Sequence, residues 1–422
     1  MKDKKENKKR FFLRTLPIIM IPILVSASIV STHSTYLIRE PFNYVIYILA
    51  TLFIYLFIIG LFLVKRKKYK RRIYKVISRF FCFSYIICAV ISIFLLYGPY
   101  KNFREWLIAT AMSTMNHQYL CKWFYNDNEI NKVLNNNYIK EVNEDTNTDL
   151  IKLEEEVTYD NEYEKQILKR NKNAKYKIIE LEVNGQNAYL AAIYDPSKLK
   201  VAVTSSLGVK GEYVTDMAEK NNALVGINGG GFYDPGYVST GGSPTGVTIS
   251  NGKVITNNTY GNYTQGGGII GLTNENKLVL IRNKNAYTAV KEGVRDAVSW
   301  GPFLIVNGKK SFIKGNGGWG YAARTAIGQR KDGIILLLVV DSNSTRTKGA
   351  DMVDLTDIMY NYGAINAANL DGGTSSVMVL PKKEASKYKK DCTKNYCNIN
   401  DPIDGRLRHQ TRRIATSIIL TK

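Results

Sequence analysis

The chain has 422 residues and a formal net charge of +22, which allows about two or three domains. The first 125 residues carry 20 Lys and Arg against 4 Asp and Glu, so +16 of the charge lies there and only +6 in the rest. This uneven distribution argues against a nucleic-acid partner, and three histidines are too few for a His-rich metal site.

Three apolar segments occupy residues 11–30, 44–64 and 80–97. Each is long enough to cross a hydrocarbon core of about 30 Å as a helix. Basic runs precede the first segment and separate the second from the third, whereas the loop between the first two has only Arg39. The positive-inside rule therefore predicts a multi-pass anchor of the plasma (cytoplasmic) membrane over residues 1–100, with the N-terminus cytoplasmic and everything after Gly98 extracytoplasmic. A cleaved signal peptide is the alternative for the first segment, but no clear small-x-small cleavage site follows it.

The next two segments are expected to connect the anchor to the outer part of the chain. Residues 101–125 are amphiphilic and aromatic at both ends, which favours an interfacial helix, with His117 in an interfacial or packing role. Residues 126–177 are rich in Asn, Glu, Asp and Lys and have little apolar periodicity. We interpret them as a polar stalk.

From residue 178 to residue 422 the pattern is that of a globular α+β domain. Short β-rich runs alternate with Gly, Asn and Asp turns, so we expect a long mixed β-sheet with a few covering helices. Helices are predicted over 214–221 and 354–362, the second with Asp354 as N-cap and Gly363 at the C′ position. Strands are predicted over 177–183, 188–193, 199–204, 223–227, 246–249, 277–281, 297–300, 303–306, 325–329, 334–340, 364–370, 376–380 and 416–420.

Three of these strands end in a polar residue followed by small residues. The run 364–370 leads into Asp371, the run 334–340 leads into Asp341, and the run 223–227 leads into Asn228 and three glycines. Small residues beside a strand end let a ligand approach the backbone. The three ends are therefore predicted to converge on one site.

Glycine-rich turns and single arginines complete the candidate site. The turns after Asn228 and Asp371 can expose backbone N–H groups as anion-binding nests, or they are merely tight turns. Arg324 leads into a small, apolar strand, where its guanidinium needs either a buried carboxylate or a bound anion. Arg412 stands in a similar place before the last strand.

At these residues the chain resembles the phosphodiester glycosidases, the uncovering-enzyme-like N-acetylglucosamine-1-phosphodiester α-N-acetylglucosaminidase family, whose bacterial members are often labelled exopolysaccharide biosynthesis proteins. The resemblance covers roughly residues 180–422. The chain departs from the family pattern by a third glycine after Asn228, by Ala323 in place of a common Pro, and by Thr374 in place of a Gly. Four motifs carry the resemblance: 228–233, 323–328, 364–376 and 412–416.

The resemblance implies a hydrolase that cleaves a sugar-1-phosphodiester, GlcNAc-1-phosphodiester-like, at the glycosidic C–O bond. Glycosidic cleavage commonly uses carboxyl groups, so Asp371 is the principal candidate, as base or nucleophile, and Asp341 the second. Arg324 is expected to hold the phosphate. The other expected substrate-binding residues are Asn228, Gly229, Gly230, Gly372, Gly373, Ser375 and Arg412.

The expected partners are a carbohydrate phosphodiester or wall polymer of the cell envelope and the lipid bilayer. No cofactor is required, although oxygen-rich turns at Asp341 and Asp371 suit Ca²⁺ or Mg²⁺. Cys392 and Cys397 are close enough in sequence to bridge a short loop in an oxidising compartment, and no Cys/His cluster near them indicates zinc. The alternative functions are a non-catalytic glycopolymer-binding or assembly module and a membrane scaffold.

Overall fold

The computed structural model describes residues 96–112, 118–122, 124–153, 161–233, 240–258, 267–342, 349–388, 392–404, 407–408 and 411–422. The chain divides into two compact units, residues 1–136 and 137–422. The predicted spans 11–30 and 44–64, and all but the last two residues of 80–97, lie outside the described residues. Within the described part of the chain, no helix has the length and apolar character needed to cross a membrane.

The described part of the first unit is helical. It contains α5 (Lys101–Met112), α6 (Gln118–Lys122) and α7 (Asp127–Leu134). Their buried side chains form one small core that includes Ile108, Cys121 and Ile130. The single interfacial helix expected over 101–125 is thus represented by two separate helices, and nothing in the described residues tests its place at a membrane.

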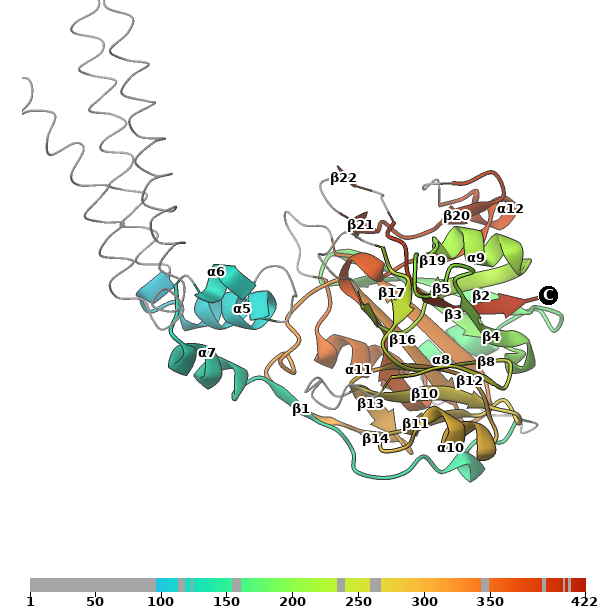
Figure 1. Cartoon of the computed structure of the whole chain (residues 1–422), viewed down its shortest axis with the longest axis horizontal. Coiled ribbons are helices and arrows are strands. Elements are labelled where there is room, and N and C mark those ends of the chain that lie inside the picture. The colour runs from blue at the N-terminus through green and yellow to red at the C-terminus, as the bar shows by residue number, and fades with distance from the viewer. Residues whose placement is uncertain are drawn as a thin grey trace, which may run out of the picture. The chain divides into compact units, whose positions relative to one another are not determined.

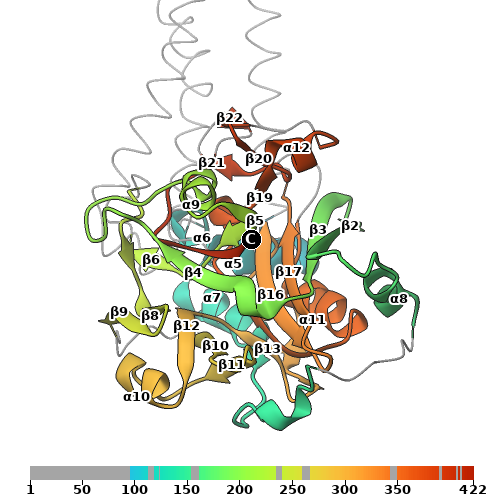
Figure 2. The ribbon, with the colours of Figure 1, turned by 90° about the vertical axis from the view of Figure 1, so that its right-hand side faces the viewer.

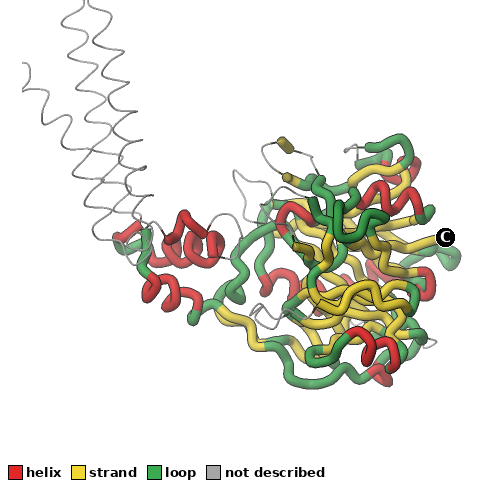
Figure 3. Tube along the Cα trace, viewed as in Figure 1, coloured by secondary structure: helices red, strands yellow, loops and turns green. Residues whose placement is uncertain are grey.

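The second unit is dominated by strands (Figures 1 and 3). A seven-stranded sheet has the order β14 (Lys309–Lys310), β13 (Phe303–Val306), β18 (Ala364–Asn369), β16 (Arg324–Arg330), β17 (Ile335–Val340), β3 (Gln186–Ile193) and β2 (Tyr176–Val183). A five-stranded sheet has the order β20 (Tyr396–Asn398), β19 (Met378–Pro381), β5 (Ala223–Asn228), β23 (Thr416–Thr421) and β4 (Leu199–Val203). Another has the order β11 (Leu278–Ile281), β10 (Gly268–Thr273), β12 (Val294–Trp300), β8 (Gly246–Ser250) and β9 (Lys253–Asn258).

The α+β class is confirmed, but the sheet arrangement differs from the expectation. We expected one long mixed sheet, whereas the strands form three larger sheets, and the neighbouring strands described in them pair antiparallel. One hydrophobic core joins all three, with Ile193 from the seven-stranded sheet, Ile227 from β5 and Ile270 from β10. Splitting the strands between sheets lets the apolar faces cover one another.

Helices cover the outer faces of these sheets (Figure 2). The helix α9 (Val214–Lys220), predicted over 214–221, packs on β5, and α11 (Met352–Asn361) packs on β18, β13 and β16. The predicted N-cap of α11 is corrected: Asp351 caps the helix, and Asp354 sits at N3, where its side chain completes a capping box. Gly363 follows the C-cap with φ +83°, as expected for C′. The remaining helices are α8 (Glu162–Leu168), α10 (Ala286–Lys291) and α12 (Lys382–Ala385).

Part of the predicted stalk belongs to the second unit, which begins at Asn137. The strand β1 (Tyr138–Lys140) pairs with β15 (Phe312–Lys314), and the Thr146 hydroxyl donates to the carbonyl oxygen of Leu280 at 3.2 Å. Farther on, Glu164 of α8 forms an ion pair with the fully buried Arg330 at 3.1 Å. The polar composition of this segment therefore serves hydrogen bonds and ion pairs to the domain.

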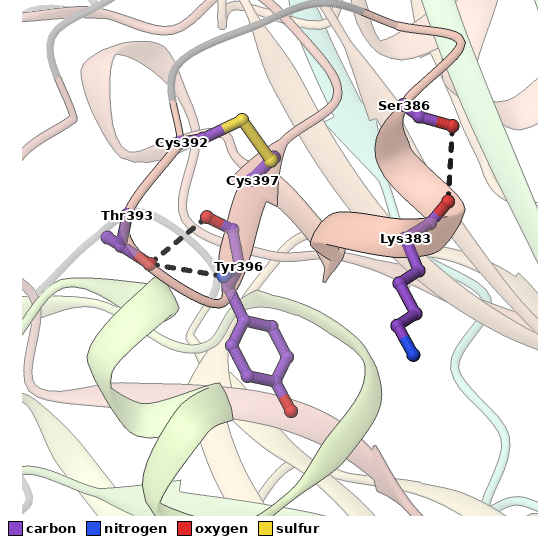
Figure 4. The surroundings of a disulfide bond; sticks show 6 residues. All are labelled: Lys383, Ser386, Cys392, Thr393, Tyr396 and Cys397. Carbon is purple, nitrogen blue, oxygen red and sulfur yellow. Dashed lines mark hydrogen bonds between the residues drawn. A yellow bond between two sulfur atoms is a disulfide. The ribbon is translucent and has the colours of Figure 1, made fainter.

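A disulfide joins Cys392 to Cys397, beside β20 (Figure 4). The Thr393 hydroxyl donates to the carbonyl oxygen of Tyr396 and accepts from its N–H, each at 3.1 Å. The cysteine pairing that the sequence left open is thus formed, and it closes the loop that leads into β20.

Candidate active site

Asn228, the last residue of β5, connects three segments at the centre of the second unit. Its side-chain Nδ2 donates to the carbonyl oxygen of Asp371 at 2.6 Å. Its Oδ1 accepts from the Thr325 hydroxyl at 2.7 Å and from the backbone N–H of Val377 at 3.2 Å. Asn228 is 1% exposed. These hydrogen bonds fix the backbone on both sides of the turn that begins at Asp371, and the predicted substrate contact of this amide stays a prediction.

Asp371 lies two residues after the end of β18 and remains partly exposed. Its Oδ1 accepts from the N–H of Gly372 at 3.0 Å, and its carboxyl also interacts with the Ser375 side chain. Burial raises the pKa of Asp371 to about 6, against the opposing effects of the Ser375 hydrogen bond and the Arg412 and Arg324 charges. A carboxyl group with this pKa exchanges its proton close to neutral pH, as acid–base catalysis requires.

Arg324, at the start of β16, is 5% exposed and is held by backbone carbonyl groups. Its Nε donates to Ala350 at 3.2 Å, and its Nη2 donates to Trp319 at 2.5 Å and to Gly320 at 2.7 Å. The pKa of Arg324 is lowered by burial to about 10, while the nearby Asp351 and Asp371 charges raise it.

The third nitrogen of Arg324, Nη1, donates to no described residue. A Cβ placed on Gly372 would lie 3.5 Å from Nη1, so this nitrogen faces the backbone of the Asp371 turn. Three carbonyl groups hold this guanidinium in place while one of its nitrogens has no acceptor in the part of the chain that the structure describes. Such a group is preorganised to donate hydrogen bonds to an anion. The arrangement favours the anion-ligand interpretation of Arg324 over that of a purely structural ion pair.

Arg412 contacts the same turn through the side chain of Thr374. Its Nη1 donates to the Thr374 hydroxyl at 3.1 Å, and its guanidinium lies 4.8 Å from the ring centre of Phe232, in the short strand β6 (Phe232–Tyr233). Its charge also lowers the pKa of Asp371. Two arginines, one at the start of β16 and one in the segment before β23, thus act on one carboxyl group.

The glycine turns have a different role from the predicted one. The N–H of Gly229 donates to Thr416 O at 2.9 Å, and that of Gly230 donates to Thr416 Oγ1 at 3.2 Å. The N–H of Gly372 donates to Asp371 Oδ1 at 3.0 Å, and that of Gly373 donates to Ala323 O at 2.7 Å. Because these four donors are used within the protein, they do not form the expected anion nest.

The second candidate carboxylate, Asp341, lies at the end of β17 and is 3% exposed. Its Oδ1 accepts from Asn400 Nδ2 and from the N–H of Asp401, both at 2.9 Å. Asn400 Nδ2 also donates to Ser376 O at 3.1 Å. Asp341 therefore holds the segment after β20 against the Asp371 turn, and its catalytic role stays a prediction.

Three supporting residues were missed by the sequence analysis: Thr325, Asp351 and Asn400. Thr325 follows Arg324 on a strand, so alternation alone puts it on the opposite face, toward Asn228. Asp351 could have been predicted as the N-cap of α11, because Asp351 and Asp354 have the Asp-x-x-Asp spacing of a capping box. Asn400 had no local signal, because its partners Asp341 and Ser376 are distant in sequence.

The described residues contain no group of three or more His, Cys, Asp or Glu side chains suited to a metal ion. The charged groups that lower the pKa of Asp371 are Arg412 and Arg324. The arrangement is that of an enzyme site for an anionic substrate, built from one carboxyl group and two guanidinium groups.

Residues 221–421 match the model of the family described as phosphodiester glycosidase. The matched range contains every candidate site residue named above. This region, a little under half of the chain, is thus similar to the phosphodiester glycosidases, which are hydrolases.

Relatives of known sequence match parts of the chain. The SPbeta prophage-derived uncharacterized protein YomE of Bacillus subtilis is 28% identical over 177 residues, 41% of this chain and 26% of that protein. The N-acetylglucosamine-1-phosphodiester alpha-N-acetylglucosaminidase of Bos taurus is 35% identical over 74 residues, 18% of this chain and 14% of that protein. The chain thus spans well under two thirds of either relative.

Among solved structures, the zebrafish N-acetylglucosamine-1-phosphodiester alpha-N-acetylglucosaminidase catalytic domain, auto-inhibited by its pro-peptide, is similar at 20% identity. The similarity covers 60% of this chain and 85% of that one, with a TM-score of 0.45. A hypothetical protein from Synechocystis is similar at 15% identity, over 58% of this chain and 61% of that one, with a TM-score of 0.35.

Proposed function

We propose that the chain hydrolyses a sugar-1-phosphodiester of the GlcNAc-1-phosphodiester type at the glycosidic C–O bond. The products are a free reducing sugar and a phosphomonoester. The observation that carries this proposal concerns Arg324. Carbonyl groups hold its Nε and Nη2, whereas its Nη1 lies beside the Asp371 turn and has no hydrogen-bond partner among the described residues. The family match and the bovine relative support the substrate class.

In this proposal the arginines bind the phosphate and Asp371 acts on the sugar. A phosphomonoester is already a good leaving group, so stabilising its developing charge matters more than protonating it. Arg324 Nη1 supplies a donor beside the backbone of the turn, and Arg412, which donates to Thr374, supplies a second positive charge at the same turn. Asp371 in its carboxylate form serves as base or nucleophile at the anomeric carbon.

The test is a comparison of wild type with Asp371→Asn on a panel of sugar-1-phosphodiesters and wall polymers, with reducing sugar as the readout. We expect release by wild type and none by the variant, which should be folded and at least as stable as wild type in thermal melts near neutral pH. Retained activity in Asp371→Asn would refute the assignment of Asp371. Tight binding by wild type without any product over a long incubation would instead support a glycopolymer-binding module.

We further propose that the anchor over residues 1–100 holds this domain outside the plasma membrane, where it acts on cell-envelope glycopolymer or exopolysaccharide. The proposal is supported by the apolar segments and the basic loops between them, and by the Cys392–Cys397 disulfide, which suits an oxidising compartment. Alkaline phosphatase fused after residue 422 should be active in cells. An inactive fusion, with a cytoplasmic reporter active at the same place, would overturn this orientation.

A further inference from the structure

The two-stranded sheet of β1 and β15 has one face in solvent and one face on the core. Tyr138 pairs with Lys314 and Lys140 pairs with Phe312, and all four side chains are exposed. Between them, Ile139 and Ile313 pair with each other and pack against the core under the seven-stranded sheet. The strand alternation therefore places two aromatic rings and two ammonium groups together on the outer face.

The exposed face is both aromatic and basic. Tyr138 is 41% exposed and Phe312 is 59% exposed, and their ring centres lie 6.1 Å apart. Lys314 Nζ lies 5.9 Å from the Tyr138 ring centre, and Lys140 makes no ion pair with any described residue. Adjacent exposed rings that remain outside the core suggest a contact surface.

This face is linked to the candidate active site by the segment that follows β15. Asn137, just before β1, accepts from the N–H of Asn316 at 3.2 Å, and a Cβ on Gly318 would lie 2.5 Å from the Asn137 carbonyl oxygen. The next residue, Trp319, packs against the same core and gives its carbonyl oxygen to Arg324. A short, glycine-rich segment thus joins the sheet face to the residue that would hold the phosphate.

We propose that the face formed by Tyr138, Lys140, Phe312 and Lys314 binds additional repeating units of a polyanionic, phosphate-linked glycan whose reacting unit lies at Asp371. The rings supply flat apolar surfaces for sugar rings, and the ammonium groups pair with backbone phosphates of the polymer. This inference rests on the proposed function, and it names the substrate as a polymer rather than a short diester.

The experiment uses the full chain with two substrates, a short sugar-1-phosphodiester and a poly(glycosyl phosphate). For the double variant Tyr138→Ser/Phe312→Ser, we expect kcat/KM on the polymer to fall about tenfold, mainly through KM, with the short substrate unaffected. Tyr287→Ser is the matched control, since Tyr287 is 67% exposed on α10. Equal effects of the double variant on both substrates, or none on either, would overturn the proposal.

A direct binding measurement keeps this test separate from that of the proposed function. The affinity of fluorescently labelled poly(glycosyl phosphate) for the full chain should fall about tenfold in Tyr138→Ser/Phe312→Ser, even if wild type turns over neither substrate. Lys140→Glu/Lys314→Glu should weaken binding and reduce its salt dependence. Unchanged polymer affinity, together with weaker binding to phosphatidylglycerol vesicles, would refute the glycan and assign the face to lipid.

Discussion

The side-chain Nδ2 of Asn228 donates to the carbonyl oxygen of Asp371 at 2.6 Å, which joins the end of β5 to the turn after β18. The strands β5 and β18 belong to different sheets, so this bond ties the backbone of the candidate catalytic residue to the end of β5 across the sheet boundary. The same amide oxygen accepts from Thr325, the residue after Arg324. Asn228 thus sets the spacing between the carboxyl group and the guanidinium group of the site.

Asn228→Ala should lower both stability and activity. It leaves the Thr325 hydroxyl, the Val377 N–H and the Asp371 carbonyl each without this partner in a buried place. A cost of about 1–3 kcal/mol per unsatisfied group predicts a clearly lower Tm in a thermal melt. Asn221→Ala, which removes one partly buried bond to Met217, is the control and should cost less. Equal losses would contradict the central place of Asn228.

Activity should rise with pH through about 6, since Asp371 has its pKa raised to that value by burial and is proposed to act as a carboxylate. Below this pH, kcat/KM should fall about tenfold per pH unit, because only the ionised fraction reacts. A pH–rate profile on the short phosphodiester measures the midpoint. A profile that falls as the pH rises through this range would instead make Asp371 a general acid.

The same pKa has a consequence for stability. The folded protein keeps the Asp371 proton to a higher pH than the unfolded chain, whose Asp pKa is about 3.9. The contribution of protonated Asp371 to the free energy of unfolding is complete below the Asp pKa of the unfolded chain. It is lost as the pH rises through the folded-state pKa of about 6. The Tm of Asp371→Asn minus the Tm of wild type should therefore increase as the pH rises from about 4 to about 7. A difference that stays constant over this range would contradict the raised pKa.

The two arginines should differ in their response to conservative substitution. Arg324→Lys loses the guanidinium that three carbonyls hold and that presents Nη1 to the turn. We expect kcat/KM to fall roughly a hundredfold, whereas Arg412→Lys, which keeps the charge in a partly exposed place, should cost roughly tenfold. Kinetics on the short substrate measure the ratio. A larger loss in Arg412→Lys would assign the principal phosphate contact to Arg412.

Gly231→Ala should destabilise the domain. A Cβ at Gly231 would lie 2.0 Å from Cζ3 of Trp300, so the β12 end or the glycine turn must move. We expect a loss of about 1–3 kcal/mol in the free energy of unfolding, measured by chemical denaturation. Gly267→Ala is the control, because a Cβ there meets no atom within 4 Å. Matching stabilities for the two variants would show that the turn relaxes without cost.

Much of the second unit could be predicted from the sequence. The strand at Phe303–Val306 has the predicted bounds, and β17 was recognisable because a continuous apolar run is buried on both sides. The strands β9 and β10 were missed. β9 is polar and only partly buried, and β10 begins with glycine and contains another, which weakens the strand pattern.

The structure brings Asn228, Arg324, Asp371 and Arg412 to one turn, and their roles stay predictions. Asp341 and Asp371 have the same local signature, a carboxylate after an apolar strand, and they differ only because the distant Asn400 segment docks on Asp341. The glycine N–H groups looked available because their acceptors, Thr416 and Ala323, are also distant in sequence. Long-range hydrogen bonds decide these roles, and a local pattern carries no information about them.

The most direct test of the central claim is hydrolysis of a GlcNAc-1-phosphodiester in ¹⁸O-labelled water, with mass analysis of both products. Cleavage of the glycosidic C–O bond places the label in the sugar and leaves the phosphomonoester unlabelled, as the proposed attack at the anomeric carbon by water or Asp371 requires. Label in the phosphomonoester would mean attack at phosphorus and would contradict the proposed function.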